Sequence, residues 1–141
     1  MHHILLLSLI LISTLCLVSS TGGYTALASE EEIEVQQDLY GALAFSPSTS
    51  AHGYSFDYAN RAAAEKRAIN ECEMNAGSDD CRAILWFHNA CGALAVGDNA
   101  YGSGWGTDML YAAQYAVESC KKFTANCKVV RWVCTSNALP E

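Results

Sequence analysis

Short apolar runs and Ala-rich stretches follow one another along residues 40–135 in an order that occurs twice. Tyr40–Phe45 is small and apolar on both faces, which is typical of a buried strand. A turn with Pro and several serines leads to a second strand at Gly53–Phe56, so the two form a predicted hairpin. A helix and a third strand at Cys81–His88 complete the first copy, and Cys91 begins the second.

The helix of the first copy is predicted from apolar residues three and four positions apart. Asp57 or Asn60 can cap its start, it runs to about Met74, and Gly77 suits the position just after its end. The residues expected to face the sheet are Ala64, Ala68, Ile69 and Cys72.

The second copy has the same plan. Strands are predicted at Cys91–Val96, Gly102–Gly106 and Cys127–Cys134. Thr107 or Asp108 can cap the helix between the last two strands, which runs through Cys120. Its expected buried stripe is Met109, Ala112, Ala113, Ala116, Val117 and Cys120.

Glycines and tryptophans suggest how the two copies align. Gly53 follows Tyr40 by thirteen residues, and Gly104 follows Cys91 by the same number. Trp86 and Trp132 then hold equivalent places, each five residues after a cysteine, and we expect both in the core. The predicted fold is α+β: two tandem ββαβ repeats, about 40–90 and 91–135, forming a layered domain of antiparallel sheet and helix stapled by disulfides.

The N-terminal pattern predicts export. Ile4–Val18 is almost wholly apolar, too short for a membrane span of roughly 20 residues but suited to a signal peptide. Ala26-Leu27-Ala28 offers a cleavage site, with an uncleaved anchor as the alternative. We therefore expect a secreted or periplasmic protein that has no membrane contact after cleavage. The predicted order is a signal peptide at 1–28, an acidic leader at 29–39, one domain at 40–135 and a tail at 136–141.

Six cysteines remain after Cys16 leaves with the signal peptide, which predicts a disulfide framework in an exported domain. Six cysteines allow 15 connectivities, and the repeat reduces them. Two cysteines end equivalent helices and two begin equivalent strands. The simplest pairing is Cys72–Cys81, Cys120–Cys127 and Cys91–Cys134.

The formal net charge of -7 lies wholly in the mature chain. An acidic domain repels phosphate backbones, so we expect no nucleic-acid partner. The cysteine spacings differ from a CxxC metal site, and we expect neither a metal nor a cofactor.

Two histidines remain after signal cleavage. His52 lies in the first hairpin. His88 of the first repeat is equivalent to Cys134 of the second, and Tyr40 is equivalent to Cys91. We therefore expect Tyr40 and His88 to be strand neighbours, with His88 buried. Acid–base chemistry at either histidine needs a nearby carboxylate and a pocket, which the sequence does not indicate. No GxSxG motif occurs.

Aromatic residues are the remaining candidates for recognition. Trp105 and Tyr101 are flanked by glycines, and Tyr54 lies in the first hairpin. Exposed aromatic side chains often mark surfaces that bind proteins or carbohydrates, although for Trp105 alone the sequence favours core packing. Trp105, Tyr101 and Tyr54 are the predicted binding residues.

Several motifs carry a resemblance to a known family. They are Tyr40-Gly41-Ala42-Leu43-Ala44, the run from Trp86 through Val96, Gly104-Trp105-Gly106 and Arg131-Trp132-Val133-Cys134. In order and spacing they resemble a family of small secreted bacterial domains of unknown function, over about residues 40–135. The resemblance implies an exported bacterial domain and supplies no activity or catalytic residue.

We therefore expect a non-enzymatic, secreted, disulfide-stabilised binding module. The candidate partners are another secreted protein, an exported enzyme that it inhibits, and a cell-wall glycan. A self-assembling extracellular subunit is the second hypothesis. A small hydrolase using His88 or His52 is the third.

Overall fold

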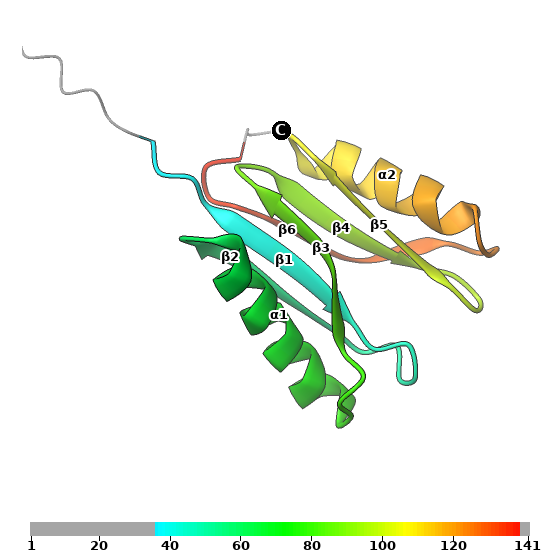
Figure 1. Cartoon of the computed structure of the whole chain (residues 1–141). Coiled ribbons are helices and arrows are strands. Elements are labelled where there is room, and N and C mark those ends of the chain that lie inside the picture. Colours follow the sequence, from blue (N-terminus) through cyan, green and yellow to red (C-terminus); the bar gives the residue numbers. More distant parts are fainter. Residues whose placement is uncertain (1–35, 139–141) are drawn as a thin grey trace, which may run out of the picture. The chain divides into compact units, whose positions relative to one another are not determined.

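The computed structural model describes residues 36–138 and contains the two predicted repeats in chain order (Figure 1). The first consists of β1 (Tyr40–Phe45), β2 (His52–Tyr58), α1 (Arg61–Ala76) and β3 (Arg82–His88). The second consists of β4 (Cys91–Val96), β5 (Tyr101–Gly106), α2 (Met109–Lys121) and β6 (Lys128–Cys134). The predicted signal peptide and residues 29–35 and 139–141 of the leader and tail lie outside the described residues.

Each repeat forms its own three-stranded antiparallel sheet, ordered β2-β1-β3 and β5-β4-β6. The first strand of each repeat is thus the central one, which explains why β1 and β4 are apolar on both faces. Ala42 and Ala44 pack against α1, and Ala93 and Ala95 pack against α2. Figure 1 shows the two helices on opposite sides of the strands. The predicted layered α+β fold is confirmed.

A third apolar cluster joins the faces of the two sheets that point away from the helices. Leu43, Leu94 and Phe87 are its largest fully buried side chains. The ring of Phe87 occupies the space that two glycines leave open. A Cβ atom built on Gly41 would lie 2.3 Å from this ring, and one built on Gly92 would lie 2.4 Å from it. One ring from β3 therefore contacts the central strands of both sheets.

The helix ends follow the predicted chemistry. The side chain of Asn60 accepts a hydrogen bond from the Ala63 N–H at 2.9 Å, and Asp108 accepts one from the Tyr111 N–H at 3.0 Å. Gly77 ends α1 in the left-handed region with φ 63°. The buried residues of the two helices belong to the predicted stripes: Ala64, Ala68, Cys72, Ala112, Ala116 and Cys120.

The alignment of the two hairpins differs from the prediction. Gly53 pairs with Ala44, and Gly102 pairs with the equivalent Ala95, so Gly53 corresponds to Gly102 and not to Gly104. The reason is that the first hairpin loop, 46–51, is longer than the second, 97–100. Beyond the glycines, an irregularity in β2, where Asp57 has φ 60°, adds to the difference.

Both glycines bring a helix against a strand. A Cβ atom on Gly53 would lie 2.3 Å from the backbone nitrogen of Cys72, and one on Gly102 would lie 2.1 Å from that of Cys120. Only glycine permits such an approach. The same contact thus recurs at the same place in each repeat.

The structure contains the three predicted disulfides, Cys72–Cys81, Cys120–Cys127 and Cys91–Cys134. Two of them tie the end of a helix to the start of the last strand of the same repeat. The third links β4 to β6, whose cysteines are strand partners. Within residues 36–138, the helices are too short or too polar to cross a membrane.

Tyr40 and His88 are strand partners in the first repeat, as the Cys91–Cys134 equivalence predicts, and their ring centroids lie 5.7 Å apart. The expected burial of His88 is wrong, because its side chain is exposed. The expected core positions of the two equivalent tryptophans are also wrong: Trp86 is 37% exposed and Trp132 is 53% exposed. All three side chains belong to β3 or β6, which are edge strands that the helices leave partly uncovered.

The described end of the leader is held in place. Asn89 exchanges hydrogen bonds with Leu39, donating its backbone N–H to the Leu39 carbonyl and accepting the Leu39 N–H on its side chain, both at 2.9 Å. Asn137 donates to the Gln37 carbonyl at 3.3 Å. The chain therefore enters β1 beside the connection between the repeats.

Candidate functional site

Two hollows lie where the edge strands of one sheet meet those of the other. We call them the β3/β5 seam and the β2/β6 seam. Ile84, Leu85, Trp86, Phe87, His88 and Trp105 line the first. Tyr54, Phe56, Val130, Arg131, Trp132, Val133 and Cys134 line the second. Because β3 corresponds to β6 and β5 corresponds to β2, the repeat relates the two seams to each other.

Trp105 is the most prominent of the predicted binding residues, with 58% of its surface exposed. Trp105 lines the β3/β5 seam and also a second hollow along the edge of β5. Tyr111 and Tyr115 of α2 line that second hollow, with ring centroids 6.4 Å apart. We call Trp105, Tyr111 and Tyr115 the aromatic surface.

Glycines of β5 place the aromatic surface. A Cβ atom on Gly104 would lie 2.6 Å from the Cβ of Tyr115, and one on Gly106 would lie 2.6 Å from that of Tyr111. The absence of side chains at both positions lets α2 lie close enough to bring its tyrosines beside β5. The remaining side chains that line this hollow belong to Ser103 and Thr107, which are uncharged. The polar side-chain groups of its lining residues are therefore hydroxyl groups and the indole N–H of Trp105.

The sequence prediction missed Tyr111 and Tyr115, although a signal was present. They are four residues apart on a predicted helix and fall outside its buried stripe, which passes through Ala112 and Ala116. Aromatic residues off the buried stripe of a helix must face solvent or a partner.

The other two predicted binding residues lie apart from the aromatic surface. Tyr101 is half-buried, and its ring centroid is 4.5 Å from that of Phe45, in a hollow near the second hairpin loop. Tyr54 lies in the β2/β6 seam, where the guanidinium carbon of Arg131 is 4.8 Å from its ring centroid. The three predicted residues therefore line different hollows, and their binding role stays a prediction.

A second group of stacked side chains surrounds Trp86. Its indole lies 6.2 Å from the imidazole of His88 and 6.4 Å from the ring of Tyr40, measured between centroids. The guanidinium carbon of Arg61 lies 4.7 Å from the centroid of the Trp86 ring, a cation–π contact. His88 is thus part of an exposed aromatic stack.

His52 lies at the start of β2 and is half-buried. Its burial, and then the nearby charge of Arg131, lower the pKa of its imidazole below 6.5. Within residues 36–138, neither His52 nor His88 forms a side-chain hydrogen bond to a carboxylate, and no three metal-ligating side chains cluster. The hydrolase and self-assembly alternatives stay predictions.

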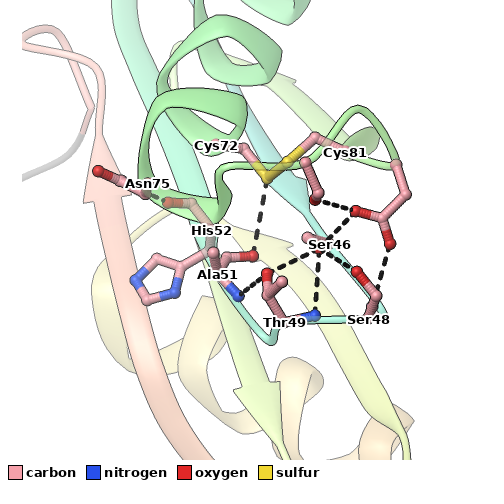
Figure 2. The surroundings of a disulfide bond; sticks show 10 residues. Ser46, Ser48, Thr49, Ala51, His52, Cys72, Asn75 and Cys81 are labelled. Carbon is pink, nitrogen blue, oxygen red and sulfur yellow. Dashed lines mark hydrogen bonds between the residues drawn. A yellow bond between two sulfur atoms is a disulfide. The ribbon is translucent and has the colours of Figure 1, made fainter.

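A polar cluster beside the Cys72–Cys81 bridge holds the first hairpin loop (Figure 2). Ser46 and Ser78 each donate a hydroxyl hydrogen bond of 2.6 Å to the same oxygen of Asp80. The Ser48 N–H donates to the other oxygen at 3.0 Å. These donors, the Ser46 hydroxyl foremost, hold the pKa of Asp80 well below its usual value. The cluster ties the loop to the segment before β3.

The second repeat joins its loops in the same way. Asn126 donates to Asp98 at 3.0 Å, and Thr124 donates to the side chain of Asn99 at 2.7 Å. Since both repeats contain such a link, we interpret these polar groups as structural.

Residues 40–134 match the family described as "Domain of unknown function (DUF4189)". The chain belongs to this family. The match covers all eight strands and helices of both repeats, so the family domain is the whole two-repeat unit.

The chain is also similar to mycobacterial proteins. Protein Rv1269c of Mycobacterium tuberculosis and Protein Mb1300c of Mycobacterium bovis are each 42% identical to it over 80 residues. The matched part is 57% of this chain and 60% of each relative, so the chain spans less than two thirds of their length.

A solved structure supports the fold. The NMR structure of Rv1813c from Mycobacterium tuberculosis matches with a TM-score of 0.50 and 29% identity, over 68% of this chain and 74% of that one. The DUF4189 domain described here is thus a disulfide-stabilised α+β domain, and its three bridges are typical of an oxidising environment outside the cytoplasm.

Proposed function

We propose that this DUF4189 domain is a secreted binding module that recognises a neutral cell-wall or extracellular glycan through the aromatic surface. The observation that carries the proposal is the exposure of Trp105 beside Tyr111 and Tyr115 along one strand edge. Exposed aromatic residues grouped around one hollow often mark a recognition site.

The chemistry of the aromatic surface favours a neutral, hydroxyl-bearing partner. Trp and Tyr combine a large apolar ring face with a polar tip. A sugar ring offers the complementary pair, an apolar C–H face and hydroxyl groups around its rim. The hollow beside Trp105 contains no charged side chain, although the chain has a net charge of -7. A charged partner would find no ionic contact there.

Trp105→Ala provides the test. The purified oxidised protein is applied to a glycan array and to insoluble bacterial cell wall, and the affinity for whichever glycan is retained is then measured by calorimetry. We expect the variant to bind at least about thirtyfold more weakly, since loss of a central aromatic anchor costs roughly 2 kcal/mol or more. Because Trp105 is more than half exposed, its thermal stability should change little.

Trp132→Ala is the matched control, because Trp132 is similarly exposed but lies in the β2/β6 seam. It should bind the same glycan as the wild type does. Equal binding by wild type and Trp105→Ala would contradict the proposal, as would failure of the wild type to bind any glycan or cell wall. If the wild type captured a secreted protein and Trp105→Ala did not, the partner of the aromatic surface would be a protein and not a glycan.

A further inference from the structure

Arg131 gives the β2/β6 seam a chemistry that the β3/β5 seam lacks. On the central strands, Leu43 pairs with Leu85 and Tyr54, and the equivalent Leu94 pairs with Arg131 and Ser103. Arg131 therefore holds the place of Leu85, and Tyr54 holds that of Ser103. The cation–π pair of Arg131 and Tyr54 replaces a neutral pair in the related seam.

Arg131 has no counter-ion among the described residues. The ion pairs of that part of the chain are Arg61–Glu65 and Arg67–Glu71, both on α1. The Nε atom of Arg131 is buried and has no hydrogen-bond partner there. A half-buried cation without an anion is costly, and the tyrosine ring compensates for only part of that cost.

Two acidic groups on the elements beside this region have other partners. Glu71, whose charge acts on His52, binds Arg67 at 2.9 Å. Asp57 accepts a hydrogen bond from the Ser136 N–H at 2.8 Å. A carboxylate that reached Arg131 from another molecule would therefore meet a cation that no carboxylate of the described chain binds.

Exposed apolar residues flank this cation along β2 and β6. Phe56, Val130 and Trp132 line the same hollow, and all three are exposed. Arginine next to exposed aromatic residues is the composition typical of binding hot spots. The seam also lies along β2 and β6, edge strands whose outer backbone groups can pair with an added strand.

We propose that the β2/β6 seam binds an extended acidic segment of a partner protein, with a carboxylate of that segment on the Arg131 guanidinium. Apolar side chains beside that carboxylate contact Phe56, Val130 and Trp132. A peptide is the occupant because it supplies all three features together: a carboxylate, flanking apolar groups and a backbone edge. This site is separate from the aromatic surface and does not depend on glycan binding there.

The test uses two capped seven-residue peptides that differ only in one side-chain group, a carboxylate in one and a carboxamide in the other. One carries a central aspartate between valines, and the other carries asparagine at that position. Each is titrated into the oxidised ¹⁵N-labelled protein and followed by NMR. We expect the aspartate peptide to shift the amide signals of β2 and β6, and the asparagine peptide to bind at least tenfold more weakly, because a charge-assisted hydrogen bond is lost.

Arg131→Leu supplies the second arm, since leucine is the residue of the related seam and should pack there. It should bind the aspartate peptide at least tenfold more weakly than the wild type does. Lys66→Gln removes the same charge from the exposed face of α1 and should bind like the wild type. The comparison of the two peptides on wild-type protein stands even if Arg131→Leu does not fold.

Three results would overturn the inference. They are equal affinity for the two peptides, unchanged binding by Arg131→Leu, and signal shifts confined to β5 and α2. Binding of glucuronic acid in an Arg131-dependent manner, with no binding of the aspartate peptide, would assign the carboxylate to a glycan and reject the protein segment.

Discussion

Replacing Phe87 tests how the two repeats are held face to face. The side chain is 2% exposed, and its ring fills the space above Gly41 and Gly92. Truncation of a buried phenylalanine to alanine costs about 3–5 kcal/mol. For a domain of about 100 residues, each kcal/mol lowers the melting temperature by roughly 4–8 °C. We therefore expect Phe87→Ala to melt at least about 12 °C below the wild type.

The glycine beneath the ring allows a sharper test. A Cβ atom on Gly92 would lie 2.4 Å from Cε1 of Phe87, and its other close neighbour is also a side chain, that of Leu85. Gly92→Ala alone should cost about 1–3 kcal/mol, because the ring must move. In the Phe87→Ala background the added methyl group enters vacated space, so the second substitution should cost almost nothing. The expected coupling is at least about 1 kcal/mol.

Urea unfolding followed by circular dichroism, with all disulfides intact, measures the four free energies of unfolding. Gly77→Ala is the control, because a Cβ atom there has no neighbour within 4 Å and the substitution strains only a left-handed φ of 63°. Its cost should add to that of Phe87→Ala. If Gly92→Ala is also additive with Phe87→Ala, to within about 0.5 kcal/mol, then the ring does not occupy the glycine's space and the packing described here is wrong.

Two further predictions concern pH. The pKa of Asp80 is lowered on folding, so its contribution to stability is complete above an unfolded pKa of about 4 and declines as pH falls below it. Asp80→Asn should therefore unfold at a lower urea midpoint than the wild type at pH 7, and the difference between the two midpoints should become smaller under acid conditions. A difference in midpoint that did not depend on pH would contradict the Ser46–Asp80 link. The pKa of His52 is lowered by burial and by Arg131, so folding favours its neutral form and its contribution is lost as pH falls below about 6.5. NMR titration should show a midpoint below 6.5 that rises in Arg131→Leu, and an unchanged midpoint would show that the Arg131 charge does not act on His52.

The order of elements could be predicted because each one leaves a local pattern in the sequence. The small apolar runs gave the bounds of β1 and β4, and the cysteines marked equivalent points of the two repeats. The hairpin alignment could not be predicted in the same way. The longer loop 46–51 changes the spacing of the glycines without changing the apolar pattern.

Exposure was the property that residue type predicted least well. Trp86, Trp132 and His88 lie on strands whose own sequences resemble core strands. They are exposed because the first strand of each repeat takes the centre of its sheet and sends the last strand to an edge. Strand order is a property of the whole repeat. It cannot be predicted from the alternation of apolar and polar residues within one strand. The pairing of Arg131 with Tyr54 likewise depends on two strands from different sheets.

The disulfide arrangement has a consequence for how the protein matures. Two bridges join cysteines only 9 and 7 residues apart, whereas the third spans 43 residues. Closing a loop of about ten residues takes roughly 10–100 ns, and its entropic cost is lower than that of a long loop. The short loops can therefore be oxidised first, within each helix–strand unit. Cys91 and Cys134 are then the remaining thiols of the described domain, so its oxidative folding needs little reshuffling of wrong pairs.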